Sequence, residues 1–226
     1  MSEISFDRVS HDFGGGRAVD DVSLVLAEHR VGIVGANGSG KSTLARMING
    51  LVTPTSGRVT VDGVDVARDG RRARRSVGFV FTNADTQIVM PTVREDVAFT
   101  LRRHRLPAAD ASARVDAALD RFGLTELADR PAHRLSGGQK QLLALASVLV
   151  AEPSIVVADE PTTLLDARNA RLVAEHFATL TQQLVLVTHH LELVEDFDRV
   201  VVMEAGRVVA DDVPARALDA YRALIG

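Results

Sequence analysis

Hydrophobic and polar residues alternate through the first part of the chain, in the pattern typical of half-buried β-strands. Apolar positions alternate over residues 4–11, a run of glycines follows at 14–16, and a second apolar run begins at 22–26. This order predicts two strands joined by a turn. A short apolar run, 31–34, then leads into a glycine-rich loop, and residues 42–51 have helical spacing. The sequence therefore predicts a strand, a glycine-rich loop and a helix in direct succession.

Residues 91–151 differ from the rest of the chain because their apolar residues have mostly helical spacing. Before them, the runs 57–61 and 76–81 are predicted as strands, separated by a charged stretch that is predicted as a solvated loop carrying four arginines, Arg71, Arg72, Arg74 and Arg75. Helices are predicted at residues 93–103, 109–122, 124–129 and in the apolar stretch after Gly138. This block is interpreted as a helical insertion.

Strands and helices alternate again after residue 154. Strands predicted at 155–158, 184–188 and 200–203 consist of consecutive apolar residues, which is typical of strands buried on both faces of a parallel sheet. A helix is predicted to begin at Asp166, with four apolar residues on one face: Ala170, Val173, Phe177 and Leu180. The pattern predicts an α/β fold with a parallel sheet covered by helices.

The composition excludes several classes of protein. The chain has 226 residues and no cysteine, so disulfides, thiolate metal sites and cysteine nucleophiles are excluded. Its 30 acidic and 26 basic residues give a net charge of −4, which lacks the basic excess of a nucleic-acid binder, so no nucleic-acid partner is expected. The longest apolar stretch, 142–151, is about half the length needed to cross a bilayer, and no secretory signal begins the chain. We expect a cytoplasmic protein.

The glycine-rich loop has the spacing of a phosphate-binding P-loop. Residues 35–42 read GANGSGKS, which satisfies G-x-x-x-x-G-K-[ST] between a predicted strand and a predicted helix. Glycines let backbone N–H groups turn toward phosphates, and the helix start adds about half a positive charge. Lys41 is expected to bridge the β- and γ-phosphates, and Ser42 to place its hydroxyl on Mg²⁺. The predicted nucleotide-binding residues are Gly35, Asn37, Gly38, Ser39, Gly40, Lys41, Ser42 and Thr43.

Two adjacent carboxylates close the apolar strand predicted at 155–158. Asp159 is expected to hold Mg²⁺ together with Ser42, directly or through water, because carboxylates and hydroxyls are hard oxygen ligands. Glu160 is then available as the base that polarises an attacking water. A third motif, Leu-Ser-Gly-Gly-Gln at 135–139, stands directly before an apolar helix, so its backbone N–H groups form a second predicted anion site.

These motifs, with Thr188 and His189 after a further strand, occur in the order that resembles an ATP-binding cassette (ABC) ATPase, and the resemblance covers essentially the whole chain. It implies a RecA-like P-loop NTPase core with a parallel sheet, an N-terminal antiparallel β-subdomain and an inserted α-helical subdomain. The implied single nucleotide-binding domain spans 1–226, with the core at 1–90 and 152–226 and the helical subdomain at 91–151.

The resemblance also implies roles for individual residues. In this family two domains enclose two ATP molecules head to tail, so Ser136, Gly137, Gly138 and Gln139 would act on the ATP of the partner. His189 would hold the γ-phosphate and the catalytic geometry, with Glu160 and Lys41 as the other catalytic groups. Phe13 is expected to stack on the adenine, with a place in the hydrophobic core as the alternative. Asp166 is expected to belong to the loop that crosses the dimer interface.

The chain departs from the family where a glutamine normally follows the strand that ends near Phe81, because Thr82 stands there instead. Gln87 lies five positions later and could not be assumed to substitute. The stretches around Val80–Asn83 and 87–97 resemble the ATPases of energy-coupling-factor (ECF) importers of vitamins and metals. Within that group, the threonine at position 82 makes the chain most similar to the biotin-module ATPase. That resemblance implies a membrane substrate-binding protein and a transmembrane coupling protein at the cytoplasmic face of the membrane, received near residues 82–99.

Three functions are considered. The first is the ATPase of an ECF importer, a homodimer or a heterodimer that uses ATP and Mg²⁺ to power uptake of a vitamin, with biotin favoured and a cobalt or nickel importer as the alternative. The second is a soluble ABC ATPase outside transport. A P-loop GTPase is excluded, because neither lysine, Lys41 or Lys140, follows an asparagine as Asn-Lys-x-Asp requires.

Overall fold

The computed structural model describes residues 2–226, and the chain forms two compact units. The first comprises residues 2–79, 154–160 and 180–226, and the second comprises residues 80–153 and 161–179. The fold is α/β, with a mixed sheet of mostly parallel strands, as the sequence predicts.

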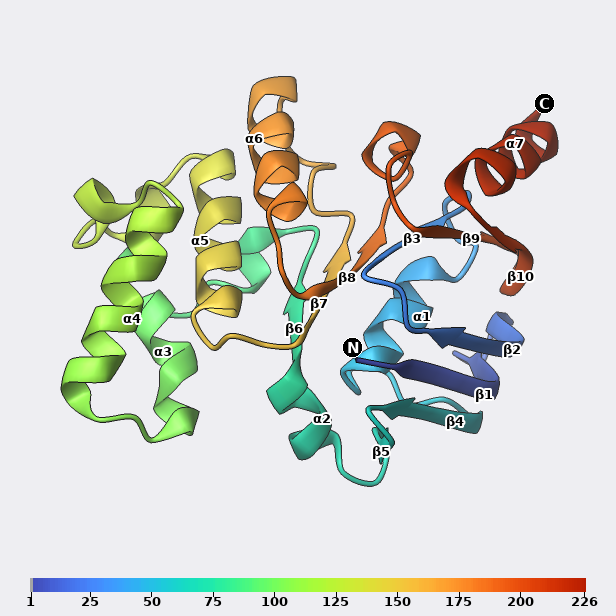
Figure 1. Cartoon of the computed structure of the whole chain (residues 1–226), viewed down its shortest axis with the longest axis horizontal. Helices are drawn as coiled ribbons and strands as arrows, with labels where there is room; N and C mark the ends of the chain where they lie inside the picture. The colour runs from blue at the N-terminus through green and yellow to red at the C-terminus, as the bar shows by residue number, and fades with distance from the viewer. Residues whose placement is uncertain (1) are drawn as a thin grey trace. The chain divides into compact units, whose positions relative to one another are not determined.

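The first unit is built around a six-stranded sheet in the order β10-β9-β3-β8-β7-β6 (Figure 1). Pairing is parallel between β3 and β8, between β3 and β9, and between β7 and β8, whereas β10 pairs with β9 in the antiparallel sense. The strands span β3 Arg30–Val34, β6 Val77–Val80, β7 Ile155–Asp159, β8 Gln183–Val187, β9 Arg199–Glu204 and β10 Arg207–Asp212. Every residue of β7 and β8 is buried, so consecutive apolar residues do mark the central strands.

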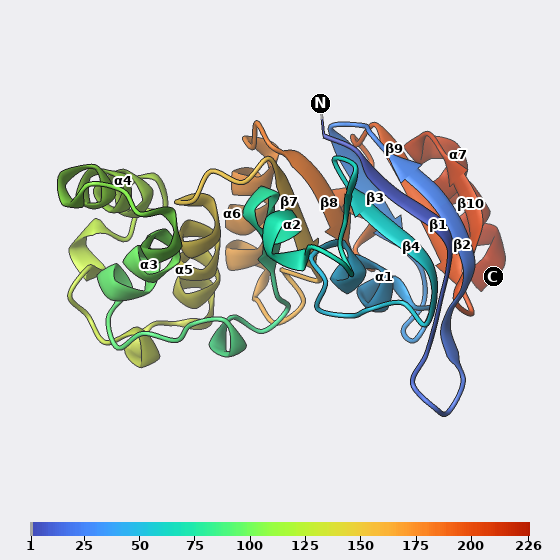
Figure 2. The same ribbon diagram turned by 90° about the horizontal axis from the view of Figure 1, so that it is seen from below.

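A second, antiparallel sheet completes this unit, in the order β2-β1-β4-β5. Its strands are β1 Ile4–Asp12, β2 Arg17–Leu26, β4 Ser56–Val61 and β5 Val64–Asp65. Helix α1 (Lys41–Ile48) contacts strands of both sheets, namely β7 and β8 of one and β2 and β4 of the other, and Figure 2 shows it beside β4. Because the helix is enclosed on two sides, Leu44 and Ile48 are fully buried and the P-loop at its start is held between the sheets.

The elements of this unit that were not predicted from the sequence include helix α2, strand β10 and helix α7. The charged stretch that was predicted as a loop is helix α2 (Gly70–Ser76), so that prediction is wrong, although its four arginines are exposed. Asp69 caps this helix by accepting the N–H of Arg72, which explains why so polar a segment is helical. The other two are β10 and helix α7 (Pro214–Ile225), which packs against β9 and β10.

The second unit is helical, with α5 (Gly137–Leu149) in contact with α3, α4 and α6 (Figure 1). Its other helices are α3 Val93–Leu101, α4 Ala108–Arg121 and α6 Ala167–Ala178, with short 3₁₀ turns that include η1 Ala84–Thr86 and η3 Thr125–Leu127. Residues 143–146 of α5 are fully buried, and α6 buries Val173 and Phe177 of the face predicted from the sequence. Ala170 is half-buried, and Leu180 lies beyond the end of this helix at Ala178. Among the described residues, no helix is both long and apolar enough to cross a bilayer.

Candidate functional site

The P-loop of the first unit has the backbone geometry that the sequence motif predicts. Residues 35–40 connect the end of β3 to the start of α1, and Gly35 and Gly40 have positive φ angles of 150° and 98°. A Cβ at Gly40 would overlap the carbonyl oxygen of Ala18, and one at Gly35 would overlap that of Met203. Because both neighbours are backbone atoms, only glycine fits at these two positions.

Lys41 lies inside this loop and is 5% exposed. Its Nζ donates hydrogen bonds to the carbonyl oxygens of Gly35 and Ala36, each at 2.8 Å. Burial lowers the pKa of Lys41, and the negative charges of Glu160 and Asp159 oppose that effect. A cation enclosed by backbone groups at a helix start is suited to bind an anionic ligand such as a phosphate.

The two predicted magnesium residues lie together. Ser42 is in the first turn of α1 and Asp159 is the last residue of β7, where it is 1% exposed. The Oγ of Ser42 donates to Oδ1 of Asp159 at 2.6 Å, and Nη2 of Arg46 lies 3.1 Å from Oδ2. A hydroxyl and a buried carboxylate are oxygen donors that fit Mg²⁺. Among the described residues, no group of three or more histidine, cysteine, aspartate or glutamate side chains is arranged to hold a metal ion.

Glu160 and His189 also lie together, at the ends of β7 and β8. Nδ1 of His189 is 2.8 Å from Oε2 of Glu160, whose side chain is 13% exposed. Glu160 has a positive φ of 51°, and its N–H donates to the carbonyl of Val187, which fixes where the carboxylate points. The neighbouring His190 pairs with Glu192 instead.

Phe13 lies in the hairpin between β1 and β2, and its side chain is 68% exposed. The alternative that it is a core aromatic is therefore wrong. The ring of His11 contacts it edge-on, with the centroids 4.4 Å apart and the planes at 76°. An exposed ring that a neighbour holds in this way is available for stacking on a flat ligand.

The second unit contains the Leu-Ser-Gly-Gly-Gln motif at the start of α5. Oγ of Ser136 accepts the N–H of Gln139, and Oε1 of Gln139 accepts the N–H of Ser136, so the two form a capping box. Gly137 and Gly138 occupy the first turn, where backbone N–H groups have no partner within the helix. A Cβ at Gly138 would overlap the side chain of Asn169, so this glycine is required by packing within the unit.

Asp166 caps helix α6 in the same unit. Its Oδ1 accepts the N–H of Asn169 at 2.9 Å, and its Oδ2 accepts the Asn169 side-chain amide at 2.7 Å. These hydrogen bonds lower the pKa of Asp166. Asn169 therefore connects the cap of α6 with the start of α5, a link that the sequence does not reveal.

Thr82 follows β6 and is half-buried. Gln87, the nearest glutamine, is occupied within the second unit, because Oε1 accepts the N–H of Phe81 and Nε2 donates to the carbonyl of Ala144. Gln141 donates to the carbonyl of Phe81. The two glutamines hold the backbone of residue 81 against α5, so Gln87 has a structural role in this unit.

Two residues near these sites were missed by reasoning from the sequence. Arg46 could have been found because it follows Ser42 by four residues on one helix, which places both on the same face. Gln141 carried no such signal, because its partner Phe81 is 60 residues away in the sequence.

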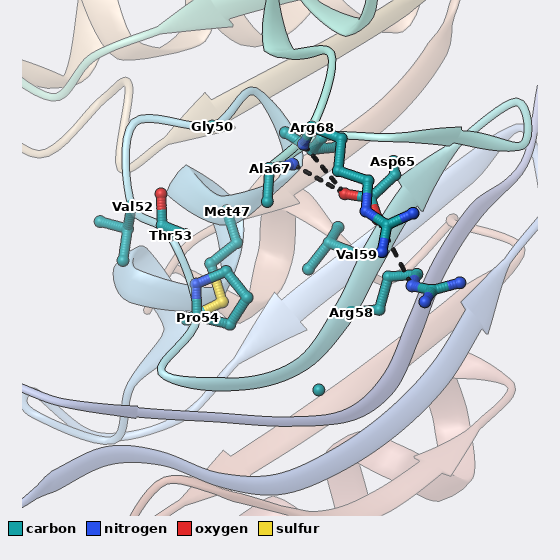
Figure 3. Close-up of a pocket in the computed structure, with 12 residues that line it drawn as sticks. Met47, Gly50, Val52, Thr53, Pro54, Arg58, Val59, Asp65, Ala67 and Arg68 are labelled. Atoms are coloured by element: carbon teal, nitrogen blue, oxygen red, sulfur yellow. Dashed lines mark hydrogen bonds and ion pairs between the residues drawn. The ribbon is translucent and has the colours of Figure 1, made fainter.

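A pocket of about 220 Å³ lies at the other end of α1, between that helix and the β4–β5 region (Figure 3). Asp65 accepts the N–H groups of Ala67 and Arg68, at 3.0 and 3.2 Å, and forms an ion pair with Arg58. None of its lining residues is a predicted nucleotide or metal residue. It therefore does not belong to the site described above.

Comparison with known proteins agrees with this geometry. The family model described as ABC transporter matches residues 19–163. An ABC transporter ATP-binding protein of Deinococcus radiodurans is 51% identical over 219 residues, covering 97% of both chains. The biotin transport ATP-binding protein BioM of Rhizobium etli is 45% identical, also covering 97% of both. The energy-coupling factor transporter ATP-binding protein EcfA1 of Bacillus subtilis is 39% identical over 92% of this chain and 76% of its own.

A solved structure, cbiO1 of Clostridium perfringens, described as part of the ABC transporter complex cbiONQ, superimposes with a TM-score of 0.83. It is 33% identical and the alignment covers 98% of this chain and 92% of that one. The resemblance inferred from the motifs is therefore confirmed. The chain belongs to the ABC transporter family, as an ATP-binding subunit that hydrolyses ATP with Mg²⁺ and whose relatives include ECF-type ATPases.

Proposed function

We propose that this chain is the ATPase subunit of an ECF-type importer and that it powers uptake of biotin. The observation that carries the ATPase part is the grouping, in one unit, of Lys41 in the P-loop, the Ser42–Asp159 pair and the Glu160–His189 pair. The importer type is supported by relatives named BioM and EcfA1 and by the cbiO1 structure.

The residues of this site have separate roles in the proposal. Lys41 and the N–H groups of the P-loop bind and orient the phosphates, while Ser42 and Asp159 hold Mg²⁺, which supplies positive charge against the phosphate oxygens when bound. Glu160 accepts a proton from the attacking water. His189, in contact with Glu160, holds that carboxylate in place and lies beside the transferred phosphoryl group. Phe13 stacks on the adenine.

The signature motif, residues 136–139, acts on a second copy of the site in this proposal. One chain carries one P-loop and one signature motif. In this proposal, each P-loop pairs with the signature motif of a second subunit. Two ATPase subunits, identical or paired with a second ABC ATPase, would each place Ser136, Gly137 and Gly138 at the γ-phosphate bound by the other. Asp166, at the start of α6, would lie in the loop that crosses the interface.

A membrane partner is proposed to dock near residues 82–99. In this segment Val89 and Phe99 are 61% and 43% exposed, so they offer apolar surface that a partner could cover. The partners would be a transmembrane coupling protein and a substrate-binding membrane protein, with the ATPase peripheral at the cytoplasmic face. Biotin is favoured because the relative named biotin transport ATP-binding protein BioM is 45% identical to this chain and covers 97% of it.

The chemistry is tested by the variant Glu160→Gln. Loss of the base should lower ATP turnover by at least 10²-fold, the scale of general-base catalysis, while nucleotide affinity stays within about twofold and an ATP-bound dimer accumulates. Glu192→Gln is the matched control, since it makes the same substitution on an exposed residue after β8. Unchanged turnover in Glu160→Gln would remove Glu160 from the mechanism.

The biological role is tested by purifying the tagged protein from gently solubilised native membranes. Recovery of a transmembrane coupler and a small membrane protein that retains biotin supports the full proposal. Recovery of the same partners with a bound metal ion reassigns the substrate. A lone permease, or soluble partners alone, refutes the ECF assignment and leaves the ATPase chemistry in place.

A further inference from the structure

One face of α1 holds both oxygens of Asp159. Ser42 and Arg46 are four residues apart in the helix, so their side chains project in the same direction. Ser42 donates to Oδ1 at 2.6 Å and Arg46 reaches Oδ2 at 3.1 Å. A guanidinium thus contacts one oxygen of the carboxylate that would help to hold a divalent metal.

Burial makes this contact important. Asp159 is 1% exposed, and Glu160 adds a second carboxylate next to it in the sequence. A buried carboxylate without a compensating cation is strongly destabilising. Lys41 donates to the carbonyls of Gly35 and Ala36, whereas Arg46 is in direct contact with the Asp159 carboxylate.

The Arg46 side chain is reached by solvent and is held by few hydrogen bonds. It is 43% exposed, and its Nε, although buried, has no hydrogen-bond partner among the described residues. The contact with Asp159 is made by one terminal nitrogen, without the two parallel hydrogen bonds that fix an arginine on a carboxylate. Another cation can therefore replace Arg46 at the carboxylate.

We propose that Arg46 is the resident counter-cation of the magnesium site. It compensates the negative charge of the Asp159 carboxylate and holds that carboxylate in position while the site has no metal, and it would compete with Mg²⁺ for the carboxylate. The site therefore has low affinity for the free ion and takes up Mg²⁺ together with the nucleotide phosphates, when Arg46 swings toward solvent. Arg46 is a positioning residue, and the inference rests on the proposed role of Asp159.

The test measures magnesium affinity directly. Metal-free protein with a fixed concentration of a fluorescent ADP analogue is titrated with Mg²⁺, and the half-saturating concentration is recorded. Arg46→Met should lower it, on the order of tenfold, because one charge a few ångströms from a divalent ion at a partly exposed site has an effect of that size. Arg46→Gln keeps a hydrogen-bond donor without the charge and should lower it as well, which provides a second neutral variant if the methionine variant does not fold.

Thermal unfolding supplies a second readout. The melting temperature of Arg46→Met should fall most in EDTA without nucleotide and recover with Mg²⁺ and ADP, since the metal replaces the missing charge. Arg72→Met removes one charge from an exposed position of α2 and should change neither readout. An unchanged or raised half-saturating Mg²⁺ concentration in both neutral variants overturns the role of Arg46. Failure of the unmodified protein to bind the ADP analogue at any Mg²⁺ concentration would instead overturn the proposed function.

Discussion

Asp96 is predicted to hold together the part of the second unit that is proposed to receive the membrane partner. It lies in the first turn of α3 and is 3% exposed. Oδ1 accepts the backbone N–H groups of Val89 and Met90, at 2.8 and 3.0 Å, and Oδ2 accepts the hydroxyl of Ser147 at 2.8 Å. One carboxylate thus connects the loop before α3 with the central helix α5.

The cost of losing Asp96 can be estimated from these three hydrogen bonds. Each bond to a charged acceptor contributes about 1.5–3 kcal/mol, and a buried donor left without an acceptor costs about as much. Val89 lies in an exposed loop, so its N–H can regain water when the carboxylate is removed, whereas Ser147 is 6% exposed. We therefore expect Asp96→Ala to lower the free energy of unfolding by about 3–4 kcal/mol, a large part of the ~5–15 kcal/mol that is typical of a domain.

Urea unfolding and hydrogen exchange measure this effect. Asp96→Asn is the matched variant, because the amide keeps one acceptor oxygen for the two backbone N–H groups, and its loss should be about 1 kcal/mol. Exchange should accelerate at residues 89 and 90 in Asp96→Ala, while the affinity for nucleotide stays within about twofold because the P-loop belongs to the other unit. Equal losses in the two variants, or a loss below about 1 kcal/mol in Asp96→Ala, would refute the reasoning.

Two further predictions concern single side chains. Phe13→Ala should weaken ATP binding several-fold with little loss of stability, since the ring is 68% exposed, and Phe13→Tyr should restore it; equal affinities in a nucleotide titration would exclude stacking. Burial lowers the pKa of His176, and the positive charge of Arg121 lowers it further, so the unfolded chain takes up the proton first as pH falls below about 6.5. The free energy of unfolding should therefore decrease between pH 7.5 and 5.5, and His176→Gln should show less of this decrease in urea titrations at the two pH values.

Much of the site could be predicted because its residues are close together in the sequence. The P-loop takes its geometry from glycines within one short segment, and Asp159 and Glu160 follow an apolar strand whose end must reach the edge of the sheet. Consecutive burial along β7 and β8 confirms the interpretation of apolar runs as central parallel strands. Local patterns sufficed where the physical cause was local.

Contacts between distant segments could not be predicted in this way. The ion pair of Arg46 with Asp159 joins residues 113 positions apart, and the contact of Gln87 with Ala144 spans 57. Helix α2 was missed because its arginines have no apolar face, and its stability comes from the Asp69 cap. Helix α7 did carry a signal that was overlooked, with Pro214 at its start and Ala217, Leu218 and Tyr221 buried on one side.

Three charged groups of the first unit, Lys41, Asp159 and Glu160, have protein partners in the described structure, and this constrains how ligands bind. Lys41 is bonded to carbonyls, Asp159 to Ser42 and Arg46, and Glu160 to His189. Phosphate alone would satisfy Lys41 while placing negative charge near Asp159, and Mg²⁺ alone would have to displace Arg46 without relieving Lys41. The two ligands together replace both sets of partners with opposite charges, so each should raise the affinity for the other by the same factor. This reciprocity makes the magnesium titration of the Arg46 variants informative, because removing one competing cation must weaken the dependence of metal binding on nucleotide.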